Sequence, residues 1–223
     1  MLSLLYPHTC AACHTDVLHR QSEVCPACQM QLPETGFTGM PDNPVEQLFW
    51  GRLPLTSATS LYYFQKGSTI QTLLHAIKYD GNKRLAHQLG AELGRACLPF
   101  HSSPPADALI PLPLFPKKEK QRGYNQARLI AEGMGSVLGV PVWNQVIART
   151  QATQTQTRKG RLERWKNIDG KFELKDPASI HGKRLILVDD VVTTGATLDA
   201  CGNELLKAHL SELHLAVLAL ASH

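Results

Sequence analysis

Residues 185–197 read Leu-Ile-Leu-Val-Asp-Asp-Val-Val-Thr-Thr-Gly-Ala-Thr, and this stretch predicts how the rest of the chain folds. The apolar run Leu185–Val188 indicates a strand of a parallel sheet covered by helices, because such strands lose the alternation of polar and apolar residues. A helix is predicted directly afterwards, because apolar residues recur at helical spacing at Leu198, Cys201, Leu205 and Leu206. The turn between the strand and the helix is then Val191–Gly195.

This turn carries groups that suit a phosphate. The hydroxyls of Thr193, Thr194 and Thr197 can donate hydrogen bonds, and Gly195 lets the backbone approach a ligand closely. The free N–H groups and the dipole at the start of a helix favour an anion. Open α/β sheets bind ligands at the carboxyl ends of their strands, so the sequence predicts a phosphate-binding loop here.

The two acids that precede this loop need a different partner. Ionised Asp189 and Asp190 only accept hydrogen bonds and would repel a phosphate. We expect them to face the vicinal hydroxyls of a sugar or a hydrated Mg²⁺. Either acid alone is more typical of a residue that caps the next helix. Together with the phosphate loop, however, the acids indicate a sugar phosphate.

The whole chain of 223 residues suits one substantial domain with a small appendage. No apolar run approaches the roughly 20 residues that span a bilayer. Met1–Pro7 is too short, and lacks the basic start, for a secretory signal. We therefore expect a cytoplasmic protein without membrane insertion. The net charge of +4 is compatible with a phosphorylated ligand or a nucleic acid and requires neither.

Two Cys-x-x-Cys pairs lie near the start of the chain, separated by eleven residues: Cys10, Cys13, Cys25 and Cys28. Two such pairs can supply the four thiolates that tetrahedral Zn²⁺ prefers, so the spacing predicts a structural zinc site. A reducing cytoplasm disfavours disulfides, and a redox motif would need only one pair. We expect His8 and His14 to lie nearby without binding the metal.

The apolar pattern divides the remaining chain into helices and strands. Helices are expected at 68–81, with Ser68 as a possible cap, at 83–97 and from 123 onward. Strands are expected at 58–64, 108–114, 146–148, 185–188 and 213–221. This order implies an α/β protein with a parallel twisted sheet and right-handed crossovers. The predicted divisions are a cysteine module at 1–35, a connector rich in Pro and Gly at 36–56, and the main domain at 57–223.

Cationic side chains that can meet an anion lie in three places. Lys78 ends a predicted helix, where it either complements the dipole or binds an anion. Arg122 directly precedes another predicted helix, whereas its neighbours Lys117, Lys118 and Lys120 are more typical of a solvated loop.

The third place is the long polar segment 149–167, which is typical of a lid that closes over a pyrophosphate. It also suits single-stranded DNA, because Trp165 can stack on a base among the cations Arg149, Arg158, Lys159, Arg161, Arg164 and Lys166. The sequence leaves both interpretations open.

Residues 185–197 resemble the phosphoribosyl-pyrophosphate-binding motif of type I phosphoribosyltransferases. The resemblance implies that Asp189 and Asp190 hold the ribose hydroxyls. It places the 5′-phosphate on the loop formed by Thr193, Thr194, Gly195, Ala196 and Thr197. It also implies Mg²⁺ bound together with phosphoribosyl pyrophosphate. The pyrophosphate would lie on Lys78, Arg122, Arg149 and Arg164.

Further segments extend the resemblance to the ComF/GntX family of phosphoribosyltransferase-like proteins. These are His75–Gly81, Pro111–Leu114, Arg122–Ala127, residues 149–167 and the four-cysteine module. The resemblance implies a link to natural competence and DNA uptake, with single-stranded DNA and uptake proteins as partners. Two functions follow as alternatives. One is a phosphoribosyltransferase with an unknown acceptor, and the other is a non-catalytic module that senses the sugar phosphate and binds DNA or a partner.

Overall fold

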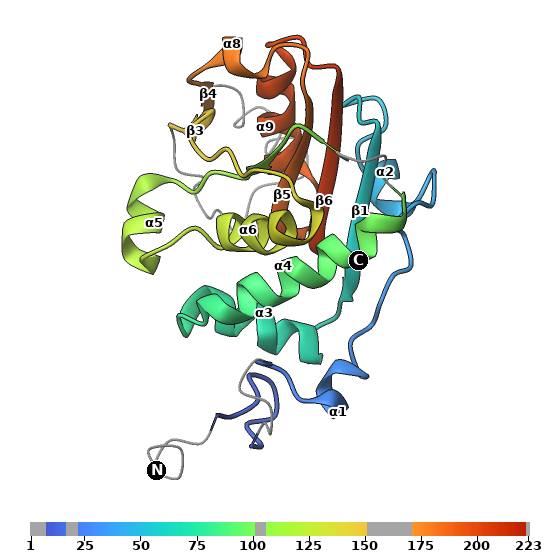
Figure 1. Cartoon of the computed structure of the whole chain (residues 1–223), viewed down its shortest axis with the longest axis vertical. Coiled ribbons are helices and arrows are strands. Elements are labelled where there is room, and N and C mark those ends of the chain that lie inside the picture. Colours follow the sequence, from blue (N-terminus) through green and yellow to red (C-terminus); the bar gives the residue numbers. More distant parts are fainter. Residues whose placement is uncertain (1–7, 17–21, 101–105, 151–170, 222–223) are drawn as a thin grey trace, which may run out of the picture.

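A four-stranded parallel sheet forms the centre of the computed structural model, which describes residues 8–16, 22–100, 106–150 and 171–221 (Figure 1). The strands lie in the order β1 (Ser57–Phe64), β6 (Glu212–Ala221), β5 (Arg184–Val192) and β2 (Ala108–Pro111). Each neighbouring pair is parallel. The predicted α/β class with a parallel sheet is therefore confirmed.

Helices cover both faces of the sheet, so successive residues of β5 enter different cores. Ile186 and Val188 pack with α3 (Thr69–Tyr79), α4 (Lys83–Cys97) and α6 (Gln126–Leu138). Leu185 and Leu187 pack on the other face with α9 (Ala196–Leu206) and α2 (Pro44–Gln47). Burial on both faces explains why the strand sequence is continuously apolar.

The cysteine module packs against the helical face instead of standing apart. Cys10, Val24 and Cys28 belong to the same buried cluster as α3 and α4, and the short helix α1 (Pro26–Gln29) carries Cys28. Residues 33–35 then run antiparallel along the free edge of β1, where Glu34 pairs with Tyr62. The division of the chain at 35 and 56 stays a prediction.

Two parts of the predicted order of elements are wrong. The strand expected at 146–148 is β3 (Ile147–Arg149), and it pairs antiparallel with β4 (Phe172–Leu174) in a separate two-stranded sheet. Strands of three residues are too short for apolar periodicity to place them in a sheet. The basic stretch expected as a loop is the helix α5 (Pro116–Arg122), which begins with proline and ends at Gly123 with a φ of 82°.

The remaining helical segments are short: η2 (Leu98–Phe100) and α8 (Pro177–Ile180). The side chain of Ser68 does not cap α3, because its hydroxyl donates to the carbonyl of Gln65 instead. Within the described ranges, no helix combines the length and apolarity needed to cross a membrane.

Candidate anion-binding site and cysteine cluster

A polar cavity of about 270 Å³ lies at the carboxyl end of β5. Most of the residues predicted for a sugar phosphate line it, although they come from separate segments of the chain. The lining includes Lys78, Arg122, Arg149, Asp189 and Asp190, together with the whole loop Thr193–Thr197. The tertiary structure therefore brings two acids, several cations and the predicted phosphate loop into one place.

The loop itself is shorter than predicted, because β5 continues through Val192. Gly195 occupies the cap position of α9 with a φ of 74°, a conformation that side chains rarely adopt. A Cβ at this position would lie 2.8 Å from the ring of Phe49. Because glycine has no side chain, it cannot bind the first N–H groups of α9, as capping residues usually do. Those N–H groups are suited to an anionic ligand.

The two acids are buried, and each has a polar or charged neighbour. Asp189 Oδ1 accepts from the backbone N–H of Asp190 at 2.8 Å, and Lys78 Nζ lies 2.7 Å from Asp190 Oδ2. Burial raises the pKa of Asp189 well above its usual range, and the neighbouring charge of Asp190 raises it further. Lys78, expected at the pyrophosphate, therefore contacts an acid in this structure.

Cations also line the cavity: Lys118, Arg122 and Arg149. The pKa of Lys118 is lowered by burial and by the charges of Arg122, Arg149 and Lys78. The Arg149 guanidinium packs over the ring of Phe172, with its central carbon 5.4 Å from the ring centre. Arg122 Nη1 donates to Gln126 Oε1 at the start of α6. Several positive charges held this close together favour a ligand with more than one negative charge.

Two residues of this site were missed by the sequence analysis. Lys118 lines the cavity, although it was interpreted as part of a solvated loop. Arg52, in the predicted connector, donates from Nη2 to the carbonyl of Thr194 at 3.3 Å. Proline is common at the start of a helix, so Phe115-Pro116 could have indicated that Lys118 lies in a helix and not in a loop. No local sequence pattern indicates that Arg52 lies near the site. Arg164 and the rest of the predicted lid from residue 151 to 167 lie outside the described residues.

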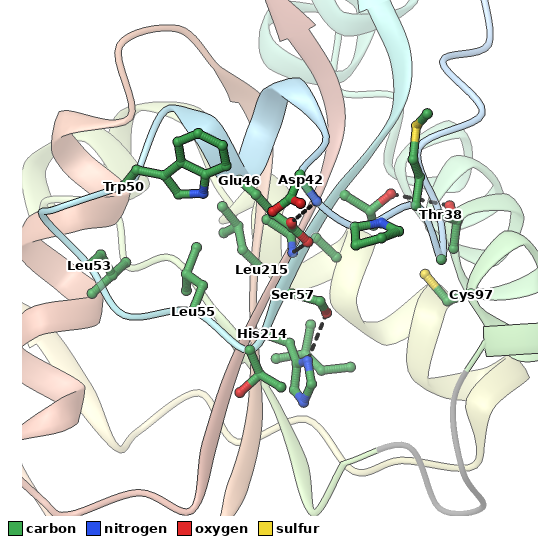
Figure 2. Close-up of a pocket in the computed structure, with 18 of the residues that line it drawn as sticks. Thr38, Asp42, Glu46, Trp50, Leu53, Leu55, Ser57, Cys97, His214 and Leu215 are labelled. Carbon is green, nitrogen blue, oxygen red and sulfur yellow. Dashed lines mark hydrogen bonds between the residues drawn. The ribbon is translucent and has the colours of Figure 1, made fainter.

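A second, larger cavity of about 550 Å³ lies toward the amino ends of β1 and β6 (Figure 2). Its polar residues include Asp42, Glu46, Ser57 and His214. Ser57 Oγ lies 2.8 Å from His214 Nδ1. Among the described residues that line it there is no Lys or Arg. The acidic lining disfavours a phosphate, so the smaller cavity is the candidate site.

The four cysteines of the N-terminal module form one cluster. Their Sγ atoms all lie within 4.8 Å of one another, and all four thiols are free. The Sγ atoms of Cys13 and Cys25 are 3.7 Å apart, close to the distance of about 3.8 Å between sulfurs around tetrahedral zinc. The backbone N–H groups of Ala12 and Cys25 donate to Cys10 Sγ, which favours a thiolate. The donor set fits a metal ion, and His8 contacts the carbonyl of Ser22 instead.

The C-terminal part of the chain is similar to a known class of domain. Residues 125–223 match the family described as phosphoribosyl transferase domain. This match includes β5, the two acids and the loop Thr193–Thr197. This part of the chain is therefore similar to phosphoribosyltransferase domains.

The chain is also homologous to proteins named for DNA use and competence. It is 28% identical over 209 residues to the DNA utilization protein YhgH of Salmonella typhi. The aligned region covers 92% of this chain and 87% of that protein. It is 34% identical over 116 residues to competence protein F of Haemophilus influenzae, covering 52% of this chain and 51% of that protein.

Two solved structures of proteins named for phosphoribosyl chemistry align with part of this chain. A purine phosphoribosyltransferase from Pyrococcus horikoshii aligns at 20% identity and a TM-score of 0.35, over 59% of this chain and 69% of that one. The glutamine phosphoribosylpyrophosphate amidotransferase of B. subtilis aligns at 20% identity and a TM-score of 0.40, over 59% of this chain and 25% of that one.

Proposed function

We propose that the cavity at the carboxyl end of β5 binds phosphoribosyl pyrophosphate. The observation that carries this proposal is that two acids, the loop Thr193–Thr197 and the cations Lys118, Arg122 and Arg149 line one cavity of about 270 Å³. The loop Thr193–Thr197 binds the 5′-phosphate, and Asp189 and Asp190 accept hydrogen bonds from the ribose hydroxyls. Lys118, Arg122 and Arg149 bind the pyrophosphate.

Binding includes an exchange of partners at Asp190. Lys78 Nζ lies 2.7 Å from Asp190 Oδ2, and a buried charge that loses its partner is costly unless another replaces it. When a ribose hydroxyl reaches Asp190, Lys78 is released toward the nearby pyrophosphate. Mg²⁺ bound with the ligand would neutralise charge on the leaving pyrophosphate, and Asp189 and Asp190 are the carboxylates that line this cavity.

The function that follows is transfer of the phosphoribosyl group to an acceptor in a protein associated with competence and DNA use. The second candidate is a module that binds the sugar phosphate without turnover and engages single-stranded DNA or an uptake protein. The names of the homologues favour a role in DNA use and are compatible with either candidate. Release of pyrophosphate in a screen of purine, pyrimidine and amine acceptors separates the two.

Calorimetry with phosphoribosyl pyrophosphate and Mg²⁺ tests the ligand directly. We expect binding by the wild-type protein and weaker binding by Asp190→Asn, by about 1–3 kcal/mol, because the variant loses a charged acceptor. Asp42→Asn is the matched control, since Asp42 lines the other cavity and its φ of 56° is one that Asn also adopts. Equal affinity in Asp190→Asn, or no binding by the wild type, contradicts the proposal.

We propose that the four-cysteine cluster holds one structural Zn²⁺, in a cytoplasmic protein whose thiols stay reduced. Protein purified without chelator should contain about one equivalent of zinc, and Cys10→Ser with Cys13→Ser should lose it. Cys97→Ala is the control, because Cys97 is buried in the core away from the cluster. Wild-type zinc content in the double variant argues against this site.

A further inference from the structure

The segment between α2 and β1 packs against the loop Thr193–Thr197 and the helix α9 that follows it. Phe49 is buried, and a Cβ added to Gly195 would lie 2.8 Å from its ring. Leu53 is also buried, and a Cβ added to Gly202 in α9 would lie 2.6 Å from its side chain. A part of the chain that precedes the central sheet therefore lies directly against the loop proposed to bind phosphate.

Arg52 joins this segment to the loop through a hydrogen bond. Its Nη2 donates to the carbonyl oxygen of Thr194 at 3.3 Å. The guanidinium also packs over the ring of Phe49, with its central carbon 5.6 Å from the ring centre. Asn203 in α9 donates from Nδ2 to the carbonyl of Arg52 at 3.4 Å and to that of Asp199 at 2.9 Å. Contacts of its main chain and its side chain thus fix Arg52 beside the start of α9.

The Arg52 side chain reaches the loop from outside the candidate site. Thr194 and Gly195 line the cavity of about 270 Å³, whereas Arg52 is not among the described residues that line it. Arg52 also lies outside residues 125–223, the part of the chain that is similar to phosphoribosyltransferase domains. Any effect of Arg52 on a ligand in this cavity must therefore act through the loop.

The direction of the Thr194 carbonyl determines which backbone group of this peptide faces the ligand. A carbonyl oxygen only accepts hydrogen bonds, so a carbonyl pointing into the cavity would repel a phosphate. The peptide unit is planar and trans, so the N–H of Gly195 points opposite to the carbonyl of Thr194. Gly195 has a φ of 74° and, as a glycine, allows many orientations of this peptide. A contact that holds the carbonyl is therefore needed to select one orientation.

We propose that Arg52 is a positioning residue for the phosphate-binding loop. By holding the Thr194 carbonyl outside the cavity, Arg52 directs the N–H of Gly195 toward the phosphate of a sugar phosphate. Arg52 does not contact the ligand and takes no part in chemistry. This inference rests on the proposed function, and it extends the site to a residue of the segment between α2 and β1.

The test uses ribose 5-phosphate as the probe and measures two quantities. Calorimetry gives the affinity, and the amide resonance of Gly195 in ¹H–¹⁵N spectra reports whether its N–H binds the phosphate. In the wild type we expect the Gly195 amide proton to move downfield when ribose 5-phosphate is added. Arg52→Met keeps an unbranched side chain on Phe49 and loses the donor. It should bind about 5- to 10-fold more weakly, the effect of about one hydrogen bond, with a smaller shift of the Gly195 resonance.

The control variants separate positioning from charge and from folding. Arg95→Met removes the same charge from an exposed position near the end of α4, so it should match the wild type in both measurements. Arg52→Lys keeps a charged donor and should lose less affinity than Arg52→Met. Thermal unfolding checks that each variant is folded. If Arg52→Met does not fold, Arg52→Gln replaces it, because glutamine is too short to reach the Thr194 carbonyl in the same way and carries no charge.

The results that overturn the inference differ from those that overturn the proposed function. If ribose 5-phosphate binds and the wild-type Gly195 resonance does not move, the assigned role of Arg52 is wrong and the phosphoribosyl site stands. The same holds if the folded variant keeps the wild-type affinity and the full shift of Gly195. If the wild type binds neither ribose 5-phosphate nor phosphoribosyl pyrophosphate, the proposed function fails and the role of Arg52 fails with it.

Discussion

Asp189 is buried, and the burial of an ionised carboxylate lowers the free energy of unfolding. Its pKa is raised by burial first and by Asp190 second, so the folded state keeps a proton that the unfolded chain has already lost. The free energy of unfolding should therefore fall as the pH rises from about 3.9, the usual pKa of Asp, toward the raised pKa of Asp189. We infer that Asp189 is retained for binding and not for stability.

Asp189→Asn should remove this pH dependence. The variant keeps an oxygen that accepts from the Asp190 N–H and carries no charge, so it should be more stable than the wild type by about 1 kcal/mol or more at pH 8 and by less at pH 5. Denaturant titrations at the two pH values measure the difference. Asp107→Asn should behave oppositely, because the Arg184 N–H lowers the pKa of Asp107. A constant difference between Asp189→Asn and wild type at both pH values contradicts this reasoning.

The helices α4 and α6 cross at a distance that only glycine permits. A Cβ added to Gly90 would lie 2.1 Å from the carbonyl oxygen of Ile130, and one added to Gly133 would lie 2.0 Å from that of His87. Both contacts are with backbone, which cannot rotate away. This close crossing positions the start of α6, where Gln126 lines the candidate site and accepts a hydrogen bond from Arg122.

Alanine at Gly90 or Gly133 should therefore destabilise the protein by more than about 3 kcal/mol, because the two helix backbones must separate. Gly202→Ala in α9 is the matched control. The three atoms nearest to its added Cβ belong to the side chain of Leu53 and not to backbone, and alanine favours a helix by about 1 kcal/mol over glycine. Thermal unfolding should show a large loss for the first two variants and little change for Gly202→Ala. Similar losses in all three would show that the crossing is not the cause.

The cysteine module and the parallel sheet share one core through α4. Glu23, two residues before Cys25, accepts from Asn82 at 3.0 Å and pairs with Arg84 at 3.0 Å, while its N–H donates to Gln88. Cys10 and Cys28 belong to the same buried cluster as Leu85 and Leu89. The folded conformation of the module therefore depends on contacts with the start of α4 and, through Asn82, on the end of α3.

Removal of the proposed Zn²⁺ should consequently affect the whole molecule. With a chelator, the protein should still unfold in one transition, at a lower temperature than before, because the module and the helices unfold together. Cys10→Ser with Cys13→Ser should already show the lower temperature and respond no further to the chelator. A separate early transition, with the main one unchanged, would mean that the module folds independently.

The sequence predicted the elements whose signals are local. The bounds of α4 matched the prediction at 83–97, and those of β1 and β6 differed by a single residue at the start. Their apolar periodicity and end signals lie within a few turns of the chain. The strand, loop and helix start at 185–197 and the cysteine pairs could be predicted from the sequence because their signals are also local. Each is a short motif whose chemistry depends on spacing along the chain.

The sequence by itself determined the fold class, the loop Thr193–Thr197 at the start of α9 and the cysteine cluster, because the residues that define each are close neighbours along the chain. Only the tertiary structure decided that Lys78 contacts Asp190, that Arg52 reaches Thr194 and that Tyr79 lies beside Arg122. It also placed β3 with β4 instead of in the central sheet. Each of these contacts joins residues far apart in the chain, and long-range packing of the helices against the sheet brings them together.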